Sequence, residues 1–372
     1  MKMEKAVSPK GITLTLTESC NLKCTYCYEG HKTSKAMSYD VAISIINREL
    51  GDGNICPVTI DFFGGEPFLE FSLMKNVCEY TWSKNWGRDY KFFVSTNGTL
   101  FTTEVREWLE VNKEKIWCGL SFDGTPDMQD INRYQSSTLV DLDFFSKNWP
   151  TQGVKMTISK ETLPHLAEGV IYLHEKGFLV NCNLAYGPDW TSNEWDNVLQ
   201  EQLRILIDYY LSHPNVKPCS MLDMEIIYVS ENAKNEYTKW CGAGTNMKVY
   251  SPDGTCYPCH FFEPLSVGDE MAEKSLNIDF SSAVQLMDKN CEGCCLLPIC
   301  PTCYGSNFAA TGDISKKDKN LCRLTKIQAM ANSYFKYLLL RDRTDKELGI
   351  TIERRKLLTD AILRIQEAFG ID

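Results

Sequence analysis

The chain has 372 residues, of which 43% are hydrophobic and 24% charged; this length can bury one large or two medium cores, which excludes a disordered chain. The balance is acidic, with 39 Lys and Arg against 49 Asp and Glu, and without a basic cluster nucleic acid is not an expected partner. No apolar run reaches the roughly 20 residues of a membrane span, and no signal peptide opens the chain, so we expect a cytoplasmic protein without a membrane partner.

Strand-like and helical patterns alternate through the first 211 residues. Expected strands cover 11–17, 58–63, 90–95, 117–122, 155–159 and 178–184, and expected helices cover 38–50, 69–85, 102–111, 139–148, 162–176 and 194–211. Continuous apolar runs such as "YKFFVS" are typical of parallel strands covered on both faces. An eight-unit barrel typically needs about 250 residues, so we predict an α/β fold with an open, partial (β/α)6 barrel.

The pattern changes after about Cys219. Loops rich in cysteine, glycine and proline follow, which cannot bury much apolar area and must be held together by other means, such as metal clusters. Helical spacing returns after Cys322. We therefore expect a barrel over 1–212, a cysteine-rich domain over 213–325, and C-terminal helices over 326–372 that pack on the barrel.

Seventeen cysteines exceed what a cytosolic enzyme needs for its core. The count is odd, and the cysteines concentrate in two groups, at 20–27 and 241–322. This pattern favours metal ligation over disulfides. Five cysteines lie outside the two groups, with Cys56 among them. Cys78 and Cys118 are expected in the apolar core. Cys182 and Cys219 are expected there too, with a position facing the cavity as the alternative.

The first group lies in "SCNLKCTYCYEG", directly after the first expected strand. A zinc site would need a fourth ligand nearby, for which His31 is the candidate, and a closed iron–sulfur site would need four thiolates. Three thiolates on one loop suit a [4Fe–4S] cluster that leaves one iron open to another ligand.

Cys20, Cys24 and Cys27, with Tyr26 between them, resemble the signature of radical S-adenosylmethionine (radical SAM) enzymes. In that family the amino and carboxylate groups of SAM chelate the open iron. The resemblance implies that Tyr26 lies near the adenine. Later segments extend it, and the implied SAM contacts are Gly64, Gly65, Glu66 and Pro67 for the amino group, Ser95, Asn97, Ser121 and Asp123 for ribose and methionine, Arg133 for the carboxylate, and Leu184.

The second cysteine group resembles the SPASM extension of radical SAM enzymes, which binds two auxiliary [4Fe–4S] clusters. By that resemblance the outer cluster is held by Cys291, Cys294, Cys300 and Cys322, and the inner one by Cys241, Cys259 and Cys303. The inner cluster either takes Cys256 as a fourth ligand or keeps an open iron. The role of Cys295 stays open, His260 is expected to hydrogen-bond beside Cys259, and two zinc sites are the alternative to this assignment.

The resemblance implies a SAM-derived 5′-deoxyadenosyl radical that abstracts hydrogen from a substrate. SPASM enzymes mostly modify peptides and proteins, so the expected function is maturation of a ribosomally made peptide, with a cysteine thioether as the first choice and a carbon–carbon crosslink as the variant. The alternatives are an anaerobic sulfatase maturase that makes formylglycine, with Asp189 as a candidate base, and a non-catalytic iron–sulfur electron carrier.

The expected partners are a precursor peptide and a one-electron donor of the flavodoxin or ferredoxin type. Because the first strand is expected near Gly11, no leader-recognition domain is expected before the barrel. The leader would then be recognised by a separate protein, the barrel rim or the C-terminal helices. The expected host is an anaerobic bacterium.

Overall fold

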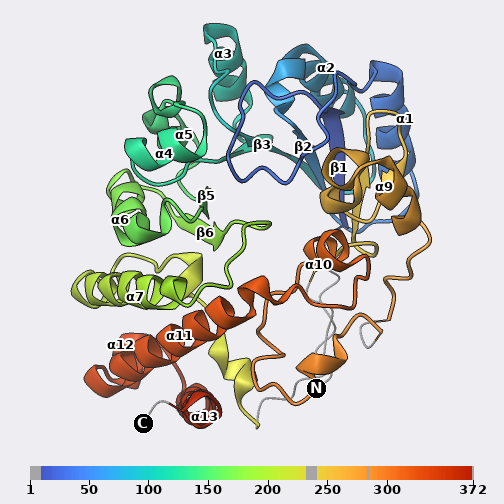
Figure 1. Ribbon diagram of the computed structural model, residues 1–372. Coiled ribbons are helices and arrows are strands. Elements are labelled where there is room, and N and C mark those ends of the chain that lie inside the picture. The colour runs from blue at the N-terminus through green and yellow to red at the C-terminus, as the bar shows by residue number, and fades with distance from the viewer. Residues whose placement is uncertain (1–9, 232–240, 283–284, 371–372) are drawn as a thin grey trace. The chain divides into compact units, whose positions relative to one another are not determined.

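A computed structural model describes residues 10–231, 241–282 and 285–370, in which strands and helices alternate as expected (Figure 1). The alternating part runs β1 Lys10–Thr17, α1 Tyr39–Leu50, β2 Val58–Gly64, α2 Phe71–Trp82, β3 Tyr90–Thr96, α3 Thr103–Asn112, β4 Ile116–Leu120, α4 Pro126–Asn132, α5 Leu142–Asn148, β5 Val154–Ile158, α6 Leu166–Glu175, β6 Val180–Leu184 and α7 Glu194–Ser212. The α/β prediction is confirmed, and α4 is an additional helix.

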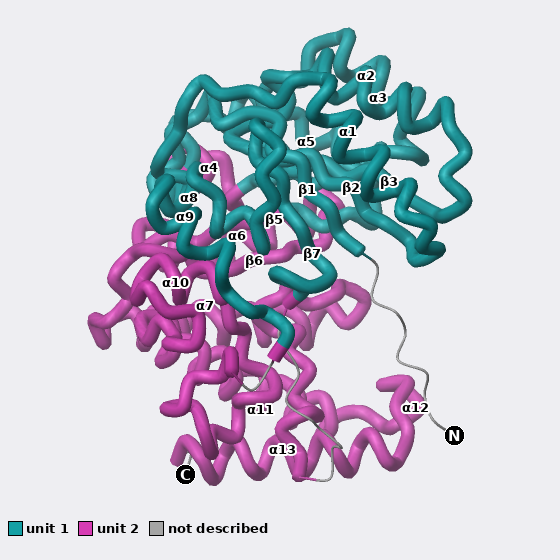
Figure 2. The backbone as a smooth tube through the Cα atoms, turned by 90° about the vertical axis from the view of Figure 1, so that its right-hand side faces the viewer, with its two compact units in different colours: residues 1–122, 133–154, 242–281 teal, residues 123–132, 155–241, 282–372 magenta. Residues whose placement is uncertain are grey.

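The chain forms two compact units, each built from separated stretches of sequence (Figure 2). Unit 1 contains residues 1–122, 133–154 and 242–281, and unit 2 contains residues 123–132, 155–241 and 282–372. These units cut across the expected boundaries at 212 and 325, which stay a prediction.

The sheet of unit 1 has the strand order β4-β3-β2-β1-β7-β8. β1 to β4 are parallel, and β7 (Met247–Tyr250) adds a further parallel strand on the other side of β1, with Leu14 opposite Tyr250. β8 (Cys256–Tyr257) pairs antiparallel with β7. Because the carboxyl ends of parallel strands meet at one edge, the loops after β1, β2 and β3 share that edge.

β1 is the central strand, and its last six residues are all buried. It lies between β2 and β7, so it has no exposed edge, and Ile12, Leu14 and Leu16 are completely covered. This explains why a run with threonine at every second position folds as a core strand.

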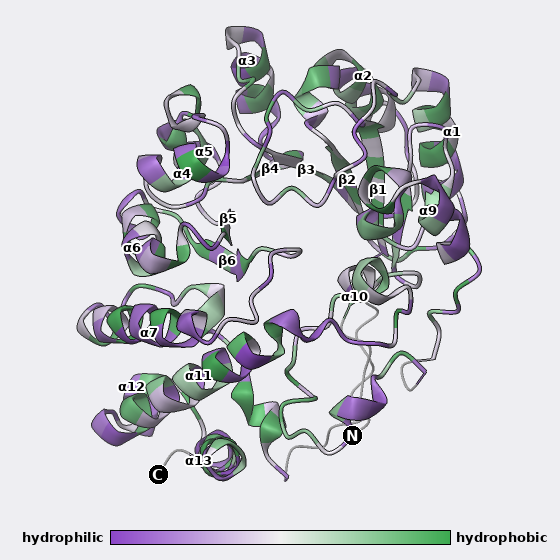
Figure 3. Ribbon diagram, in the orientation of Figure 1, coloured by the Kyte–Doolittle hydropathy of each residue, from purple (hydrophilic) through white to green (hydrophobic). Residues whose placement is uncertain are grey.

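Unit 2 contains a two-stranded sheet of β5 and β6 and several helices. α7 alternates apolar and polar residues (Figure 3) and buries Leu199, Leu203 and Leu206 at helical spacing. It packs against α11, which in turn packs against α13. The remaining α-helices of the described residues, in either unit, are α8 Pro264–Val267, α9 Asp269–Ser275, α10 Tyr304–Thr311, α11 Cys322–Asp342, α12 Asp345–Leu348 and α13 Ile352–Phe369. No helix in the described ranges is long and apolar enough to cross a membrane.

A buried carboxylate ties three elements of unit 1 together. Glu49 at the end of α1 is 3% exposed and contacts Lys10 at 2.5 Å, Lys248 of β7 at 3.2 Å and the Tyr250 hydroxyl at 2.5 Å. Burial alone would raise the pKa of Glu49, but the hydrogen bonds from Lys10 and Tyr250 and the two ammonium charges outweigh it and lower the pKa to about 2.

We predict that Glu49→Gln lowers the free energy of unfolding at pH 7 by about 1 to 3 kcal/mol, because a neutral amide then replaces the buried carboxylate that pairs with Lys10 and Lys248 and accepts from Tyr250. The folded pKa lies below the unfolded value, so the contribution of Glu49 is complete above about pH 4.5 and is lost as the pH falls toward about 2. The measurement is the unfolding midpoint of the wild type and the variant from pH 7 down to about pH 2, where the difference between them should shrink. Glu107→Gln, which changes an exposed carboxylate on α3, is the control, and equal effects of the two changes at pH 7 would contradict the prediction.

Candidate functional site

The three N-terminal cysteines lie on a closed loop that follows β1. Thr17 and Ala36 pair as an isolated antiparallel bridge, and the Met37 amide donates to the Leu16 carbonyl at 2.8 Å. The Glu18 amide donates to the Lys35 carbonyl at 2.9 Å. The two ends of the loop are therefore fixed by backbone bonds, and the cysteines lie between them.

Donors within this loop point at the cysteine sulfurs. The Leu22 amide donates to the Cys20 Sγ at 3.4 Å, and the Lys32 ammonium donates to the Cys27 Sγ at 3.0 Å. Lys32 is held there by a second bond, 2.9 Å long, to the Glu29 carbonyl. Burial raises the pKa of the Cys20 thiol, so an iron ion would have to displace its proton on binding.

The glycines that follow β2 press directly against the cysteine loop. The Gly65 amide donates to the Thr17 carbonyl at 3.0 Å, and a Cβ on Gly65 would lie 2.2 Å from the Ser19 oxygen. Gly64 has φ +133°, and a Cβ there would lie 2.1 Å from the Thr17 oxygen. Only glycine allows this approach, so the predicted amino-binding segment and the cysteine loop are in direct backbone contact.

Glu66 is buried and joins the segment after β2 to the end of β3. Its carboxylate accepts bonds from the Thr96 hydroxyl at 2.9 Å, the Asn97 amide at 2.8 Å and the Phe68 amide at 3.1 Å. Burial raises the pKa of Glu66 to about 7, while these hydrogen bonds and the charge of Arg133 act in the opposite direction. Pro67 follows as the first residue of a short 3-10 helix, Pro67–Glu70.

Asn97 connects the end of β3 to the cysteine loop. Its amide group donates to the Asn21 Oδ1 at 3.0 Å, and Asn21 in turn donates to the Thr99 hydroxyl at 2.8 Å. Ser95 lies on β3 opposite Gly119 of β4, and Ser121 follows β4 with its amide bonded to the Thr96 carbonyl. These predicted contacts therefore share the carboxyl edge of the sheet with the cysteine loop.

Arg133 lies over the ring of Tyr26, 5.5 Å from its centroid, and both belong to unit 1. Arg133 is 7% exposed. The two residues predicted to meet the carboxylate and the adenine of SAM are thus neighbours, and the aromatic face can orient the guanidinium.

Asp123 lies in unit 2 and is completely buried. Its carboxylate accepts bonds from the Thr157 amide at 2.8 Å and from Asn132 at 3.2 Å, and its own amide donates to Gln129. These bonds indicate a structural role in joining β5 to α4. Its predicted SAM contact stays a prediction.

The segment after Cys259 supports the cysteine loop within unit 1. Phe261 stacks on Tyr28 with 4.1 Å between the ring centroids, and the His31 amide donates to the Leu265 carbonyl. The ring of His260 lies 4.9 Å from that of Phe63 at the end of β2. The ring of His260 thus takes part in packing, whereas His31 is exposed and contributes a backbone bond, and neither role had a clear signal in the sequence.

The outer-cluster cysteines gather in unit 2. Cys291, Cys300 and Cys322 are close enough for their thiolate charges to act on one another, and the Cys294 amide donates to the Cys291 carbonyl at 3.1 Å. Cys294 and Cys295 are both partly buried and pack against the apolar cluster around α11 and α13. The grouping of Cys291, Cys300 and Cys322 supports the predicted ligands, and the role of Cys295 stays open.

Two of the inner-cluster cysteines also lie together in unit 2. Burial raises the pKa of Tyr186, and the nearby charges of Cys303 and Cys241 raise it further. Cys303 precedes α10, and its sulfur accepts a bond from the Ser306 amide at 3.4 Å. Tyr186 was not predicted, because a single tyrosine after a strand carries no signal for a cluster.

Cys256 and Cys259 differ in their surroundings. Cys259 is buried. Cys256 is exposed. It lies opposite Tyr250 in the antiparallel pairing of β8 with β7 and lines a surface pocket that also includes Arg48. The use of Cys256 as a fourth inner ligand stays a prediction.

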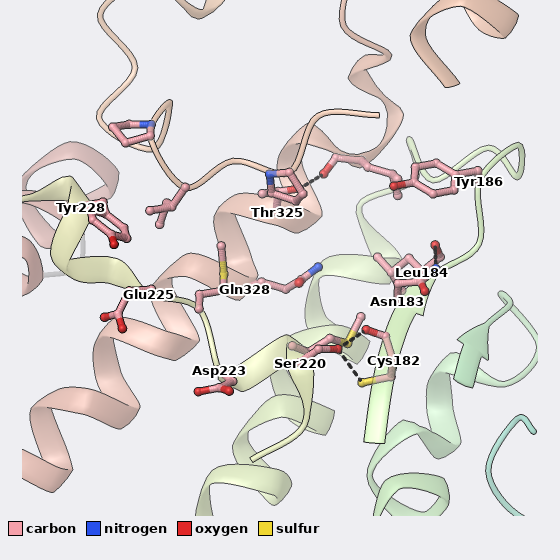
Figure 4. A pocket seen from close by; sticks show the side chains of 16 residues that line it. Cys182, Asn183, Leu184, Tyr186, Ser220, Asp223, Glu225, Tyr228, Thr325 and Gln328 are labelled. Carbon is pink, nitrogen blue, oxygen red and sulfur yellow. Dashed lines mark hydrogen bonds between the residues drawn. The ribbon is translucent and has the colours of Figure 1, made fainter. Parts of the chain in front are cut away.

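A cavity of about 440 Å³ lies in unit 2 beside the end of β6 (Figure 4). Leu184 and Tyr186 line one side, Pro298 and Pro301 of the cysteine-rich segment line another, and Thr325 of α11 completes the wall. Cys182 is buried and also lines this cavity, and Cys78, Cys118 and Cys219 are buried as expected.

Asp189 lies in the loop after β6 and is exposed. Its carboxylate accepts bonds from the Thr191 amide at 2.9 Å and hydroxyl at 2.6 Å, and these bonds lower the pKa of Asp189. This is the geometry of a surface turn. Its use as a base stays a prediction.

The sequence pattern of the Radical SAM superfamily matches residues 14–201, which is more than half of the chain. The chain belongs to the radical SAM superfamily. The family implies a [4Fe–4S] cluster and SAM, and the N-terminal loop fits them: three partly buried cysteines lie on one loop with donors aimed at two of the sulfurs. Among the described residues no three acidic, histidine or cysteine side chains converge on one metal ion, but a four-iron cluster is wider than an ion and its ligands need not meet at a point.

Relatives of this radical SAM protein include three with assigned names. The radical SAM cyclopropyl synthase TigE of Paramaledivibacter caminithermalis is 22% identical over 88% of this chain and 74% of its own length. A cysteine-type anaerobic sulfatase-maturating enzyme of Clostridium perfringens is 23% identical over 76% and 85%. The subtilosin biosynthesis protein AlbA of Bacillus subtilis is 28% identical over 68% and 55%.

Two solved structures share the fold. The sulfatase-maturating enzyme anSMEcpe, with bound AdoMet and a Cys-containing peptide, matches with a TM-score of 0.69 at 18% identity, covering 90% of this chain and 100% of that one. Streptococcus suis SuiB bound to its precursor peptide SuiA matches with a TM-score of 0.56 at 16% identity, covering 84% and 75%. These likenesses establish the radical SAM fold.

We predict that Gly65→Ala removes about four irons per chain and lowers SAM cleavage at least about tenfold, because the added Cβ pushes Ser19 and Cys20 apart from the β2 end. Iron content and 5′-deoxyadenosine formation under dithionite are the measurements. Gly30→Ala on the same loop is the control, since a Cβ there meets nothing within 4 Å. Equal iron and activity in both variants would contradict the close contact.

Proposed function

We propose that this radical SAM enzyme is a peptide maturase that installs an oxidative crosslink in a ribosomally synthesised peptide, and that the crosslink is a cysteine thioether. When bound, the N-terminal cluster and SAM supply a 5′-deoxyadenosyl radical that takes a hydrogen atom from a substrate carbon. Formation of the C–S bond then releases one proton from the cysteine sulfur and one electron.

The observation that carries this proposal is the grouping of Cys291, Cys300 and Cys322, and separately of Cys241 and Cys303, in unit 2. Two auxiliary [4Fe–4S] clusters held by these sets would accept the released electron. Residues 213–325 are the proposed auxiliary-cluster region. An electron carrier outside the chain, of the flavodoxin or ferredoxin type, is the proposed donor and acceptor.

The residues of unit 1 bind and orient SAM in this proposal. Gly64, Gly65 and Glu66 receive the amino group, and the Arg133 guanidinium meets the carboxylate as a bidentate partner. Tyr26, beneath Arg133, lies at the adenine. Ser95, Asn97 and Ser121 line the edge of the sheet where the ribose and methionine would lie.

The relatives support a peptide substrate. SuiB was solved with a precursor peptide, and AlbA acts in the biosynthesis of a bacteriocin. The cavity beside Leu184 and Tyr186 is the proposed place for a substrate side chain, because its wall includes the segment that holds Cys300. The leader would be recognised by a separate protein, the barrel rim or the C-terminal helices.

An anaerobic sulfatase maturase is the second candidate. The match to anSMEcpe covers that whole chain and has a higher TM-score than the match to SuiB. The reaction to formylglycine needs a base, and the bonds of Asp189 to Thr191 hold its carboxylate in an exposed turn. The superfamily membership argues against a non-catalytic electron carrier.

We predict that the holoenzyme, given SAM, a reductant and cysteine-containing peptides encoded beside its gene, forms a product lighter by two hydrogen atoms whose fragments stay joined in tandem mass spectra. A product that forms a hydrazone, the mark of a new aldehyde, would support the sulfatase maturase instead. The control is the Cys20→Ala, Cys24→Ala, Cys27→Ala triple variant, which should form neither product.

The same triple variant tests the number of clusters. We predict about twelve irons per chain in the reconstituted wild type and about eight in the variant, because only one of three four-iron clusters is lost. About four irons in the wild type and none in the variant would contradict the auxiliary clusters.

A further inference from the structure

Lys317 lies among the outer-cluster cysteines. Its ammonium donates to the Cys300 sulfur and is close enough to Cys291 and Cys322 for their thiolate charges to act on it. The side chain is half-buried. One lysine therefore faces three of the four proposed outer-cluster ligands, all within unit 2.

The backbone of the chain holds Lys317 in this place. The Lys317 amide donates to Asp288 Oδ2 at 2.9 Å, while Asp288 Oδ1 accepts a bond from the Asn290 amide at 2.8 Å in the turn that carries Cys291. The next amide, of Asp318, donates to Asn307 at 2.9 Å. A single carboxylate thus fixes both the Cys291 turn and the backbone from which the Lys317 side chain extends.

The neighbouring lysine is different. Lys316 is exposed, and the carboxylate in its ion pair is Asp313, at 3.8 Å. It carries the same charge one residue away. Comparison of Lys316 with Lys317 therefore separates an effect of position from an effect of net charge.

We propose that Lys317 is a positioning residue of the outer auxiliary cluster that raises its reduction potential. Reduction adds one electron, and thus one negative charge, to a cluster held by four thiolates. A half-buried ammonium against one of those sulfurs stabilises the reduced form more than the oxidised form. The outer cluster would then accept an electron released by the substrate more readily than it would without this ammonium. This inference rests on the auxiliary clusters of the proposed function.

The test uses the Cys20→Ala, Cys24→Ala, Cys27→Ala triple variant, so that only the auxiliary clusters remain. Lys317→Met, Lys317→Gln, Lys317→Arg and Lys316→Met are added to it one at a time. Iron is measured first, and a redox titration followed by electron paramagnetic resonance then gives the midpoint potentials.

We expect Lys317→Met and Lys317→Gln to keep about eight irons and to lower one of the two midpoints. At the midpoint potential of the starting triple variant, the ratio of reduced to oxidised cluster should fall about tenfold. For a one-electron couple this is a shift of the midpoint by about 59 mV. Lys317→Arg and Lys316→Met should leave both midpoints unchanged.

Unchanged midpoints in the Met and Gln variants, or an equal shift in Lys316→Met, would overturn the proposal. Loss of about four irons from both neutral variants would also overturn it, since Lys317 would then be needed to hold the cluster rather than to set its potential. Fewer than about eight irons in the starting triple variant would instead count against the proposed auxiliary clusters themselves.

Discussion

The site depends on the contact of two backbones, the turn after β2 and the turn after β1. Gly64 and Gly65 approach Thr17 and Ser19 so closely that no side chain fits between them. This contact brings the loop that holds the first cluster and the segment proposed to receive the SAM amino group to one place. Parallel pairing of β1 and β2 provides it, because both strands end at the same edge of the sheet.

Buried carboxylates reinforce this arrangement on several sides. Glu66 accepts bonds from the Thr96 hydroxyl and the Asn97 amide at the end of β3, and the single Thr15 hydroxyl of β1 lies 2.7 and 2.9 Å from the two carboxylate oxygens of Glu263. Burial raises the pKa of Glu263 to about 8. Burying a carboxylate costs free energy unless it is hydrogen-bonded. The bonds of Glu66 and Glu263 to strand residues hold the strand ends of the site in place, and Glu49 connects the same sheet to α1.

The long elements and the first cysteine loop were predictable, because apolar periodicity and cysteine spacing are local signals. β7 was not, since four residues in a cysteine-rich stretch have no periodicity, and only pairing with β1 makes them a strand. Lys317 lies in a charged run that is typical of an exposed surface. Its bond to Cys300 was not predictable, because the two residues are 17 positions apart and only the fold brings them together. Asp123 follows a strand, which is where a ligand-binding residue is expected. Its bonds to Thr157 and Asn132 were not predictable, because both partners come later in the sequence and meet Asp123 only in the folded chain.

The central claim is that the loop carrying Cys20, Cys24 and Cys27 holds a cluster whose open iron binds SAM. The most direct test is electron paramagnetic resonance of the dithionite-reduced wild type before and after addition of SAM. We predict that one cluster signal changes on SAM addition, that 5′-deoxyadenosine forms, and that neither effect occurs in the triple cysteine variant. Identical spectra with and without SAM, or SAM cleavage that survives loss of the three cysteines, would contradict the account.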